Sequence, residues 1–554
     1  MPTPFFSTHQ QLLNDAVEAI AKRGYWSAFP EIPSGKIYGE TANQDGKAVF
    51  ESQLNRSFGL SLPGTIGKTG SERSPYGFSL GITYPKVDLN WLFQSITTAQ
   101  EAWRSAGPET WAGVCLEILR RLNRRSFELA YAVMHTTGQG FMMAFQAGGP
   151  HAQDRGLEAV AYAWTELSHI PRTAYWEKPQ GKNEPLKLQK NYRIVPRGVS
   201  LVIGCSTFPT WNAYPGLFAS LATGNAVVVK PHPGAILPLA ITVETARDVL
   251  SEARLDPNLV TLVAHDFNDN TAKELALRPE VKLIDFTGSS EHGVWLEKEA
   301  KGALVFTEKA GVNQVVIDST DNFAGLAKNL AFSISLYSGQ MCTAPQNIYI
   351  PEGGIDTAGG HLSFDQVAQG IVDSVNKLLE DSARAVEILG AIQSETTLIR
   401  LEKARTLGKV LLDSHRLVHP QFPEACIQTP LLVQLSLQPE DYYTQECFGP
   451  VAFIIPTENT DAALSLARKV SQQRGSLTFS IYSTEQSVLN AATDIAADAG
   501  VALSCNLTAG VYVNQSAAFS DYHGTGANPA ANSALTDSAF VSNRFRVVQT
   551  RIPV

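Results

Sequence analysis

The chain lacks the features that mark several large classes of protein. Its 554 residues carry a formal net charge of −9 but contain no run of five like charges, so no footprint for nucleic acid or an anionic membrane surface is present. The longest apolar runs, such as Val199–Ile203, have the length of buried strands and are too short to span a bilayer. No basic stretch precedes an apolar segment at the N-terminus, so no secretory signal is predicted.

Cysteine is scarce, and the six cysteines form no CxxC pair. They are typical of reduced thiols, so we expect a cytoplasmic protein without a disulfide framework. His415 and His419 have helical spacing, but no HExxH glutamate accompanies them, and we interpret them as a satisfied surface pair; no metal site is predicted. The usual GxGxxG and P-loop fingerprints for dinucleotides and phosphates are also absent.

The composition is globular, with 44% hydrophobic and 18% charged residues, and the length predicts two or three domains. Apolar strands are expected at 199–204, 225–230, 259–264 and 281–287, and helices at 214–223, 235–253 and 271–277. Such alternation predicts a parallel sheet with helices on both faces, whose ligands bind beyond the carboxyl ends of the strands. Lys230 and Gly288-Ser289 lie at such ends, and a helix that could meet a phosphate follows the latter.

A second α/β region is predicted from about Glu308. Its expected strands are 313–317, 346–350, 430–435, 451–456, 477–482 and 511–514, and its expected helices are 322–337, 364–380 and 484–498. Ahead of both regions, helices are predicted at 12–24, 88–105 and 109–134, with an ordered Gly/Pro/Ser-rich excursion at about 28–86. Residues 186–195 and 544–551 alternate like edge strands, which suits an oligomer contact and an intramolecular hairpin equally.

Three residues in separate segments could perform carbonyl chemistry. Cys342 is either a small buried hydrophobe or a nucleophile, since it follows Gly339-Gln340 in a turn where a thiol can be exposed. Glu308 is either a solvated rim charge or a base whose pKa is raised by burial between domains. Asn212 either caps a helix with its oxygen or donates its N–H to an oxyanion. Together they suit attack on a carbonyl followed by thioester hydrolysis, and Cys205 could line the same cleft.

Six segments resemble the aldehyde dehydrogenase superfamily in their order and spacing, over about residues 90–520. They are Phe208–Pro215, Leu221–Pro231, Phe286–Ser289, Glu308–Gly311, Gly339–Cys342 and Glu446–Val451. Within the excursion, residues 74–77 and 80–85 resemble the PaaN branch, the aldehyde dehydrogenases of phenylacetate degradation.

The resemblance implies an α/β fold with a Rossmann-type NAD(P)-binding domain (1–170 and 198–308), an α/β catalytic domain (309–510) and a small β oligomerisation flap (171–197 and 536–554) in a homodimer or homotetramer. It implies that Cys342 attacks the aldehyde, that Asn212 and the Cys342 backbone N–H hold the oxyanion, and that Glu308 activates water after hydride transfer to a nicotinamide. The implied cofactor contacts are Trp211, Lys230, His232, Gly288, Ser289, Glu446 and Phe448.

Departures from the family pattern shape the finer expectations. Pro233 stands where members that prefer NAD commonly carry glutamate, so NADP is expected, with NAD as the alternative. His265–Asn270 replaces a glycine-bearing segment, and Glu308-Lys-Ala-Gly311 replaces Glu-Leu-Gly-Gly.

The PaaN branch implies a semialdehyde substrate of aromatic catabolism linked to coenzyme A, with ring opening left to a separate protein. One alternative is a CoA-acylating dehydrogenase, which the presence of Glu308 disfavours. The other is a catalytically silent binding homologue, which would not depend on Cys342.

Overall fold

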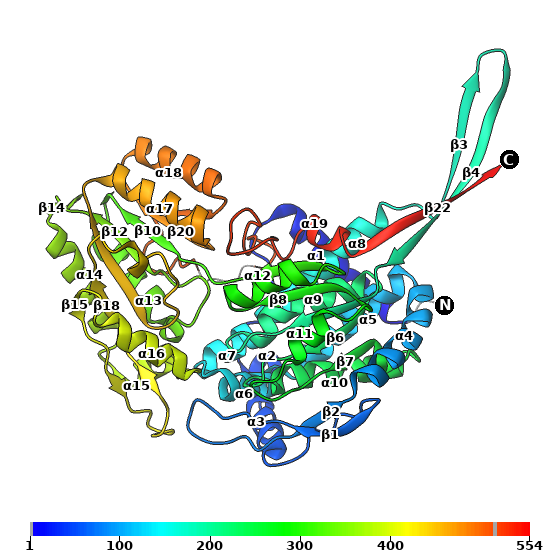
Figure 1. Cartoon of the computed structure of the whole chain (residues 1–554), viewed down its shortest axis with the longest axis horizontal. Helices are drawn as coiled ribbons and strands as arrows, with labels where there is room; N and C mark the ends of the chain where they lie inside the picture. The colour runs from blue at the N-terminus through cyan, green and yellow to red at the C-terminus, as the bar shows by residue number, and fades with distance from the viewer. Residues whose placement is uncertain (1–3, 514–517) are drawn as a thin grey trace.

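The computed structural model describes residues 4–513 and 518–554, which form two lobes and a projecting arm (Figure 1). The first lobe is built on a five-stranded parallel sheet of order β7-β6-β5-β8-β9. The strands are β5 (Val199–Ile203), β6 (Ala226–Lys230), β7 (Val260–Leu262), β8 (Val281–Thr287) and β9 (Leu304–Glu308). The helices between them are α9 (Pro209–Ala222), α10 (Leu237–Glu252), α11 (Thr271–Ala276) and α12 (Ser290–Glu299). The predicted alternation of strands and helices is confirmed.

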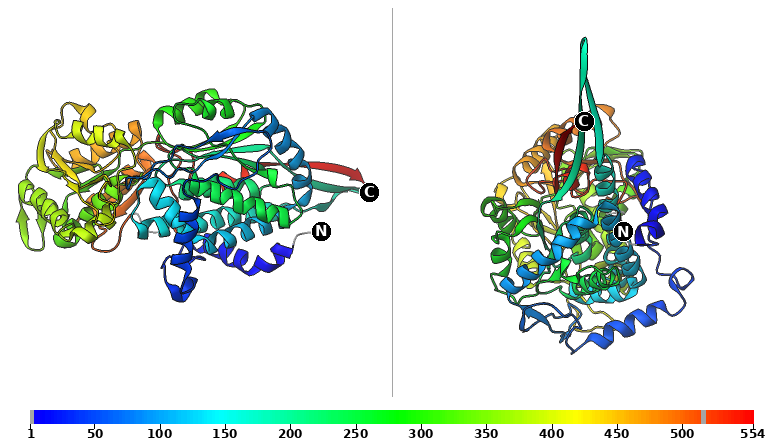
Figure 2. Two further views of the ribbon diagram at one scale, coloured as in Figure 1. Left: turned by 90° about the horizontal axis from the view of Figure 1, so that it is seen from below. Right: turned by 90° about the vertical axis from the view of Figure 1, so that its right-hand side faces the viewer.

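A helical layer precedes this sheet in the chain and packs against it (Figure 2). It contains α1 (Pro4–Lys22), α4 (Leu89–Ala106), α5 (Pro108–Arg124), α6 (Ser126–Thr137), α7 (Phe141–Gly148) and α8 (Pro150–Ser168). The single helix predicted at 109–134 is wrong, because the chain breaks at Arg125 between α5 and α6. The Arg125 guanidinium then binds Glu128 and Glu244, at 2.7 and 2.9 Å, and so fixes the corner against α10.

The excursion is ordered, as predicted, and includes α2 (Gly35–Tyr38), α3 (Ala42–Gln53), β1 (Thr65–Thr69) and β2 (Tyr84–Val87). Its Glu72 is 2% exposed and accepts hydrogen bonds from the backbone N–H groups of Ile236 and Leu237, at 2.6 and 3.0 Å, at the start of α10. A carboxylate there satisfies donors that have no partner within the helix. Tyr76 packs on Phe422 of the second lobe, so the excursion contacts both lobes.

The second lobe holds a seven-stranded sheet of order β15-β18-β19-β12-β10-β20-β21, parallel except for the edge strand β15 (Lys409–Leu412). The others are β10 (Gln314–Ile317), β12 (Asn347–Pro351), β18 (Leu431–Gln434), β19 (Val451–Thr457), β20 (Thr478–Tyr482) and β21 (Ala502–Cys505). Its helices are α13 (Phe323–Ser335), α14 (Phe364–Leu378), α15 (Ser382–Leu389), α16 (Glu395–Ala404), α17 (Thr460–Arg474) and α18 (Gln486–Ala499).

The strand predicted at 511–514 is wrong for residues 511–513, which form no strand, and residue 514 lies outside the described residues. The strand that pairs with β20 is instead β21, which begins directly after the left-handed Gly500 ends α18.

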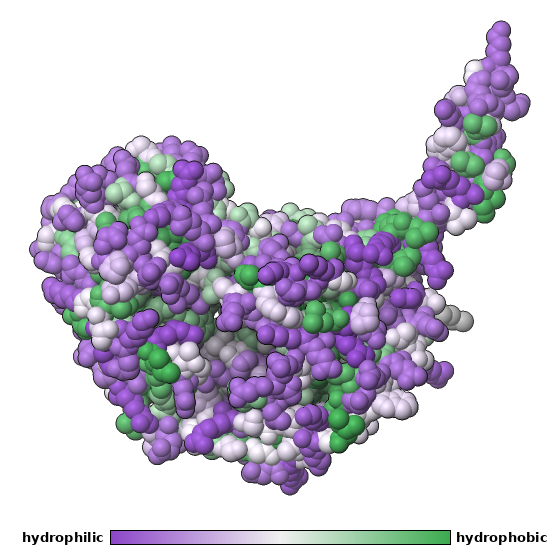
Figure 3. Space-filling model, in the orientation of Figure 1, coloured by the Kyte–Doolittle hydropathy of each residue, from purple (hydrophilic) through white to green (hydrophobic). Residues whose placement is uncertain are grey.

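The arm is a three-stranded antiparallel sheet of β3 (Thr173–Gln180), β4 (Asn183–Pro196) and β22 (Phe545–Pro553). The two segments that alternate in sequence, 186–195 and 544–551, therefore pair with each other. Apolar side chains on this sheet are exposed, among them Leu186, Val547 and Val548. Green atoms on the projecting arm in Figure 3 mark apolar surface there. Within the described residues, no helix combines the length and apolar character needed to cross a membrane.

Candidate active site

A cavity of about 580 Å³ opens at the carboxyl ends of β5, β6, β8 and β9 and reaches the second lobe. Nine of the ten predicted site residues line it: Asn212, Lys230, His232, Gly288, Ser289, Glu308, Cys342, Glu446 and Phe448. Trp211 does not. Such a site at the carboxyl edge of an open parallel sheet, beside the point where the strand order reverses between β5 and β8, is where ligands of this architecture bind.

The loop that carries Cys342 is held in place by residues around it. Gly339 has φ +62°, and a Cβ there would lie 2.2 Å from the carbonyl oxygen of Gly449, so only glycine fits between the two motifs. Asn313 donates to the carbonyls of Cys342 and Ala344, at 2.8 and 2.9 Å, and its oxygen accepts from the backbone of β20 and the residue before it. The thiol is thus fixed at the cavity wall, half-buried. Burial raises the pKa of this thiol well above its usual value, and the Glu308 carboxylate raises it further.

Glu308 ends β9, and its side chain is buried at 1% exposure. Its backbone carbonyl accepts from Gly288 N–H at 3.0 Å, which joins the carboxylate to the glycine of the cofactor motif. Burial on its own would raise the pKa of the carboxyl group. His523, Arg155 and the Cys342 thiol outweigh burial and hold that pKa below its ordinary value. The expectation of a raised pKa is therefore wrong, because the site supplies enough positive charge and donors to keep the carboxylate ionised.

Asn212 lies in the first turn of α9, which begins at Pro209 with Phe208 as its N-cap. The capping alternative for Asn212 is therefore wrong. Its Nδ2 donates to Glu308 Oε2 at 2.9 Å, and its Oδ1 lies 3.6 Å from the Cys205 sulfur, so Cys205 does line the same cleft. The amide nitrogen thus faces the Glu308 carboxylate, and an amide NH₂ carries a second N–H beyond the one used in this bond.

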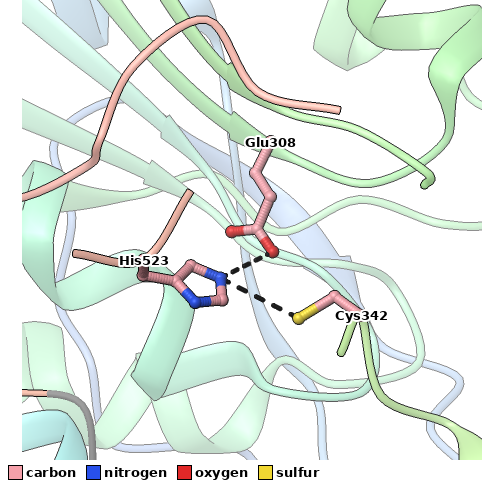
Figure 4. A group of neighbouring side chains, drawn as sticks. All are labelled: Glu308, Cys342 and His523. Atoms are coloured by element: carbon pink, nitrogen blue, oxygen red, sulfur yellow. Dashed lines mark hydrogen bonds and ion pairs between the residues drawn. The ribbon is translucent and has the colours of Figure 1, made fainter. Parts of the chain in front are cut away.

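His523 completes the group and was not predicted as a site residue, because no recognisable motif surrounds it. Its Nε2 lies 3.0 Å from Glu308 Oε1 and 3.9 Å from Cys342 Sγ (Figure 4). The residue is 8% exposed in a loop with no motif around it, and the edge of its ring meets Trp211 at 4.7 Å between centroids. One potential ligand atom each from Glu308, Cys342 and His523 lies within 4.8 Å of the other two, a spacing that a metal ion could also bridge. We call Asn212, Glu308, Cys342 and His523 the catalytic cluster.

Trp211 lies behind this cluster and stacks on the buried Arg155, whose Cζ is 3.6 Å from the ring centroid. Arg155 Nη1 donates to the Trp211 carbonyl at 3.0 Å. That carbonyl is free because Pro215, four residues on inside α9, has no N–H to give it. Burial lowers the pKa of Arg155 to about 10, so the guanidinium stays charged beside Glu308.

The far end of the cavity is lined by Lys230, His232, His265 and His292, which we call the distal cluster. Burial lowers the pKa of Lys230 to about 8 and those of His232 and His265 to about 4. The Nε2 atoms of His265 and His292 are buried without a hydrogen-bond partner. Unpaired buried nitrogens at the end of a cavity fit a polar ligand that supplies their partners.

Between the two clusters, Ser289 caps α12 at the carboxyl end of β8 and lines the cavity, so the N-terminus of this helix lies where a phosphate could bind. Glu446 and Phe448 line the opposite wall, where Arg400 Nη1 donates to the Phe448 carbonyl at 3.2 Å. Burial raises the pKa of Glu446 to about 7, against the opposing effect of a hydrogen bond from Gly311 N–H. These features fit a dinucleotide that runs from the distal cluster to Cys342.

The histidine pair predicted to be a satisfied surface pair is only partly so. His415 is exposed, whereas His419 is 3% exposed and its Nδ1 accepts from the backbone of Gln421 and Phe422. Neither residue lies on a helix, because the chain forms the short strand β16 (Arg416–Leu417) between them.

Comparison with known proteins defines the class. Residues 85–526 match the model of the aldehyde dehydrogenase family, and the chain belongs to that family. A solved structure of an NAD-dependent aldehyde dehydrogenase from Burkholderia multivorans is 61% identical, with a TM-score of 0.98 and full coverage of both chains.

Curated relatives are more distant. A Gibberella fujikuroi protein named as an aldehyde dehydrogenase is 28% identical over 298 residues, which are 53% of this chain and 59% of that protein. The 2-aminomuconic 6-semialdehyde dehydrogenase of a Pseudomonas species is 24% identical over 446 residues, 76% of this chain and 84% of that enzyme. The chain thus spans only about three-fifths of the length of the fungal relative.

Proposed function

We propose that the chain oxidises an aldehyde to a carboxylic acid through a thioester on Cys342. The observation that carries this proposal is the meeting of Cys342, Glu308 and Asn212 at one end of a cavity fitted for a dinucleotide. The Cys342 thiol gives its proton to Glu308 while sulfur bonds to the carbonyl carbon, and Asn212 N–H and the Cys342 backbone N–H stabilise the oxyanion. When bound, a nicotinamide cofactor supplies the acceptor for the hydride that leaves this carbon. Glu308 releases this first proton to solvent and then takes a proton from water, whose oxygen bonds to the carbon as the C–S bond breaks. Glu308 returns that second proton to the leaving Cys342 sulfur, which restores the thiol and the carboxylate.

The cofactor is proposed to be NADP, with NAD as the alternative. Pro233 lines the cavity and offers no carboxylate to repel a 2′-phosphate, while Lys230 and the three distal histidines can donate to one. The 61% identical relative is named as NAD-dependent, which supports the alternative. Comparing kcat/KM with the two cofactors decides between them.

The substrate class is proposed to be a semialdehyde of aromatic catabolism, linked to coenzyme A if the chain is of the PaaN branch. The likeness to a 2-aminomuconic 6-semialdehyde dehydrogenase supports the semialdehyde part. A cytoplasmic location accords with the six unpaired cysteines. The exposed apolar arm supports a homodimer or homotetramer.

The test follows reduced-cofactor formation with free and CoA-linked aldehydes for wild type and Cys342→Ala. Turnover with wild type and none with the variant is expected. Turnover that requires free coenzyme A would establish the acylating alternative. Equal cofactor binding by both proteins without any turnover would favour the silent homologue.

A further inference from the structure

We propose that His523 is a positioning residue for Glu308: its Nε2–H donates to Oε1 and holds the carboxylate beside the Cys342 thiol. This inference rests on the proposed function and deepens it. The geometry that points to it is the pair of distances from one nitrogen, 3.0 Å to Glu308 Oε1 and 3.9 Å to Cys342 Sγ (Figure 4). Asn212 donates to the other oxygen, Oε2, at 2.9 Å, so both carboxylate oxygens are held from different elements.

The segment that follows His523 is paired with the strand that ends in Glu308. Ala531 forms an antiparallel bridge with Glu308, Lys309 N–H donates to the Ala530 carbonyl at 2.6 Å, and Asn532 accepts from Thr307 N–H at 2.8 Å. The loop that carries His523 is therefore anchored at the end of β9 through these later residues. Trp211 closes the other side of the ring edge-on. A side chain held from two sides in this way keeps its donor aimed at one acceptor.

His523 is not among the residues that line the dinucleotide cavity, and Figure 4 shows its ring pointing toward both Glu308 and Cys342 from a separate segment of the chain. It can therefore remain in place when a cofactor occupies the cavity. Since the imidazole nitrogen lies 3.0 Å from Glu308 Oε1 but 3.9 Å from Cys342 Sγ, we expect its effect on the reaction to pass mainly through the carboxylate.

The charged and titratable groups that face Glu308 are His523, Arg155 from α8, Cys342 and Cys205. Burial raises the pKa of Glu308, and among the groups that oppose burial His523 has the largest effect. Loss of His523 therefore raises this pKa toward the value that burial favours. Because proton acceptance needs the carboxylate, the acidic limb of the pH–rate profile should move to higher pH.

The experiment compares His523→Leu, which removes the donor, with His523→Gln, which keeps an N–H near the position of Nε2. In His523→Leu the acidic inflection of kcat should rise by about one pH unit or more, the size of shift that the loss of a close hydrogen-bonding neighbour of a carboxylate produces. The acidic inflection of His523→Gln should lie between the inflections of His523→Leu and wild type. Thermal unfolding of each variant controls for folding, and the Gln variant keeps the test open if the Leu variant does not fold.

A second measurement needs no aldehyde. The rate at which iodoacetamide alkylates Cys342 is followed against pH in wild type, both His523 variants and Glu308→Gln. The inflection due to Glu308 should be absent from Glu308→Gln and shifted upward in His523→Leu. An unchanged inflection in His523→Leu, in turnover and alkylation alike, would overturn the proposal and leave His523 as a packing partner of Trp211. If wild type oxidises no aldehyde, the proposed function fails while the alkylation profile still decides the role of His523.

Discussion

The two ends of the cavity differ in whether the protein itself supplies hydrogen-bond partners for their polar side chains. In the catalytic cluster each side chain already has partners: Glu308 is held by Asn212 and His523, and the Cys342 loop is held by Asn313. In the distal cluster the Nε2 atoms of His265 and His292 are buried with none. One end is preorganised by the protein itself, and the other is complete only with a ligand.

This difference predicts that variants at the two ends should change different kinetic quantities. Substitutions in the catalytic cluster should lower kcat and leave cofactor binding nearly unchanged, because the groups there contact one another. Substitutions in the distal cluster should weaken cofactor binding with little change in kcat. A variant with the opposite behaviour would break the comparison.

The largest effect is expected from Glu308→Gln. The amide cannot accept a proton, so kcat should fall by roughly 10²–10⁴-fold, the usual contribution of a general base. The dissociation constant of the cofactor, measured by calorimetry, should stay within about twofold because the base is not expected to contact the adenosine half. A tenfold loss of cofactor affinity would show that the two ends are coupled.

Next in size is Asn212→Ala, which removes the side-chain donor to the oxyanion. A fall in kcat of roughly 10²–10³-fold is expected from the loss of one such donor. Steady-state rates with a saturating aldehyde measure it. If kcat were unchanged, Asn212 would serve only to orient Glu308.

Lys230→Met should sharpen the contrast at the other end. Lys230 is 6% exposed and lines the cavity beside the histidines. Loss of a charge-assisted hydrogen bond of about 1.5–3 kcal/mol corresponds to roughly ten- to hundredfold weaker cofactor binding. Titration calorimetry gives this value, and kcat at saturating cofactor should change little.

The smallest expected effect is a pH dependence of binding. Burial keeps the pKa of His265 at about 4 in the free protein, and a 2′-phosphate that it contacts would raise that pKa, so NADP binding takes up a proton. Affinity for NADP should then rise as pH falls, by up to about tenfold per pH unit for each proton taken up, whereas NAD should show a flat profile. This slope should appear between about pH 4, where His265 of the free protein titrates, and the raised pKa of His265 in the complex.

His265→Gln is the matched control for this prediction, because glutamine cannot protonate. Its NADP profile should lose the slope due to His265, and a slope that remains near pH 8 is assigned to Lys230. A sloping NAD profile in wild type would assign the proton uptake to another group in the cavity.

Much of the architecture followed from local pattern. Strands β5, β6 and β8 are short apolar runs separated by helices, and burial on both faces makes such runs recognisable. The last strand of the second lobe was harder to predict, because β21 (Ala502–Cys505) is a four-residue strand of mixed polarity. Helix α8 was missed since it is buried around most of its surface and shows no apolar stripe.

The site residues also differ in how well the sequence predicts them. Cys342, Glu308 and Asn212 stand in recognisable runs, and the structure brings them together. His523 lies 181 residues beyond Cys342 in a loop of small and polar residues, so only the tertiary fold reveals its contact. A lone histidine between Tyr522 and Gly524 is the only signal that the sequence offers.

Pro215 has a consequence for protein engineering. Replacing a proline inside a helix is a common way to stabilise a protein, and Pro215→Ala would restore the missing hydrogen bond to the Trp211 carbonyl. The restored N–H would compete with Arg155 for that oxygen and loosen the charge beside Glu308. Pro215 thus costs α9 one hydrogen bond and leaves the Trp211 carbonyl to Arg155. Pro215→Ala should therefore unfold at a higher temperature and turn over more slowly.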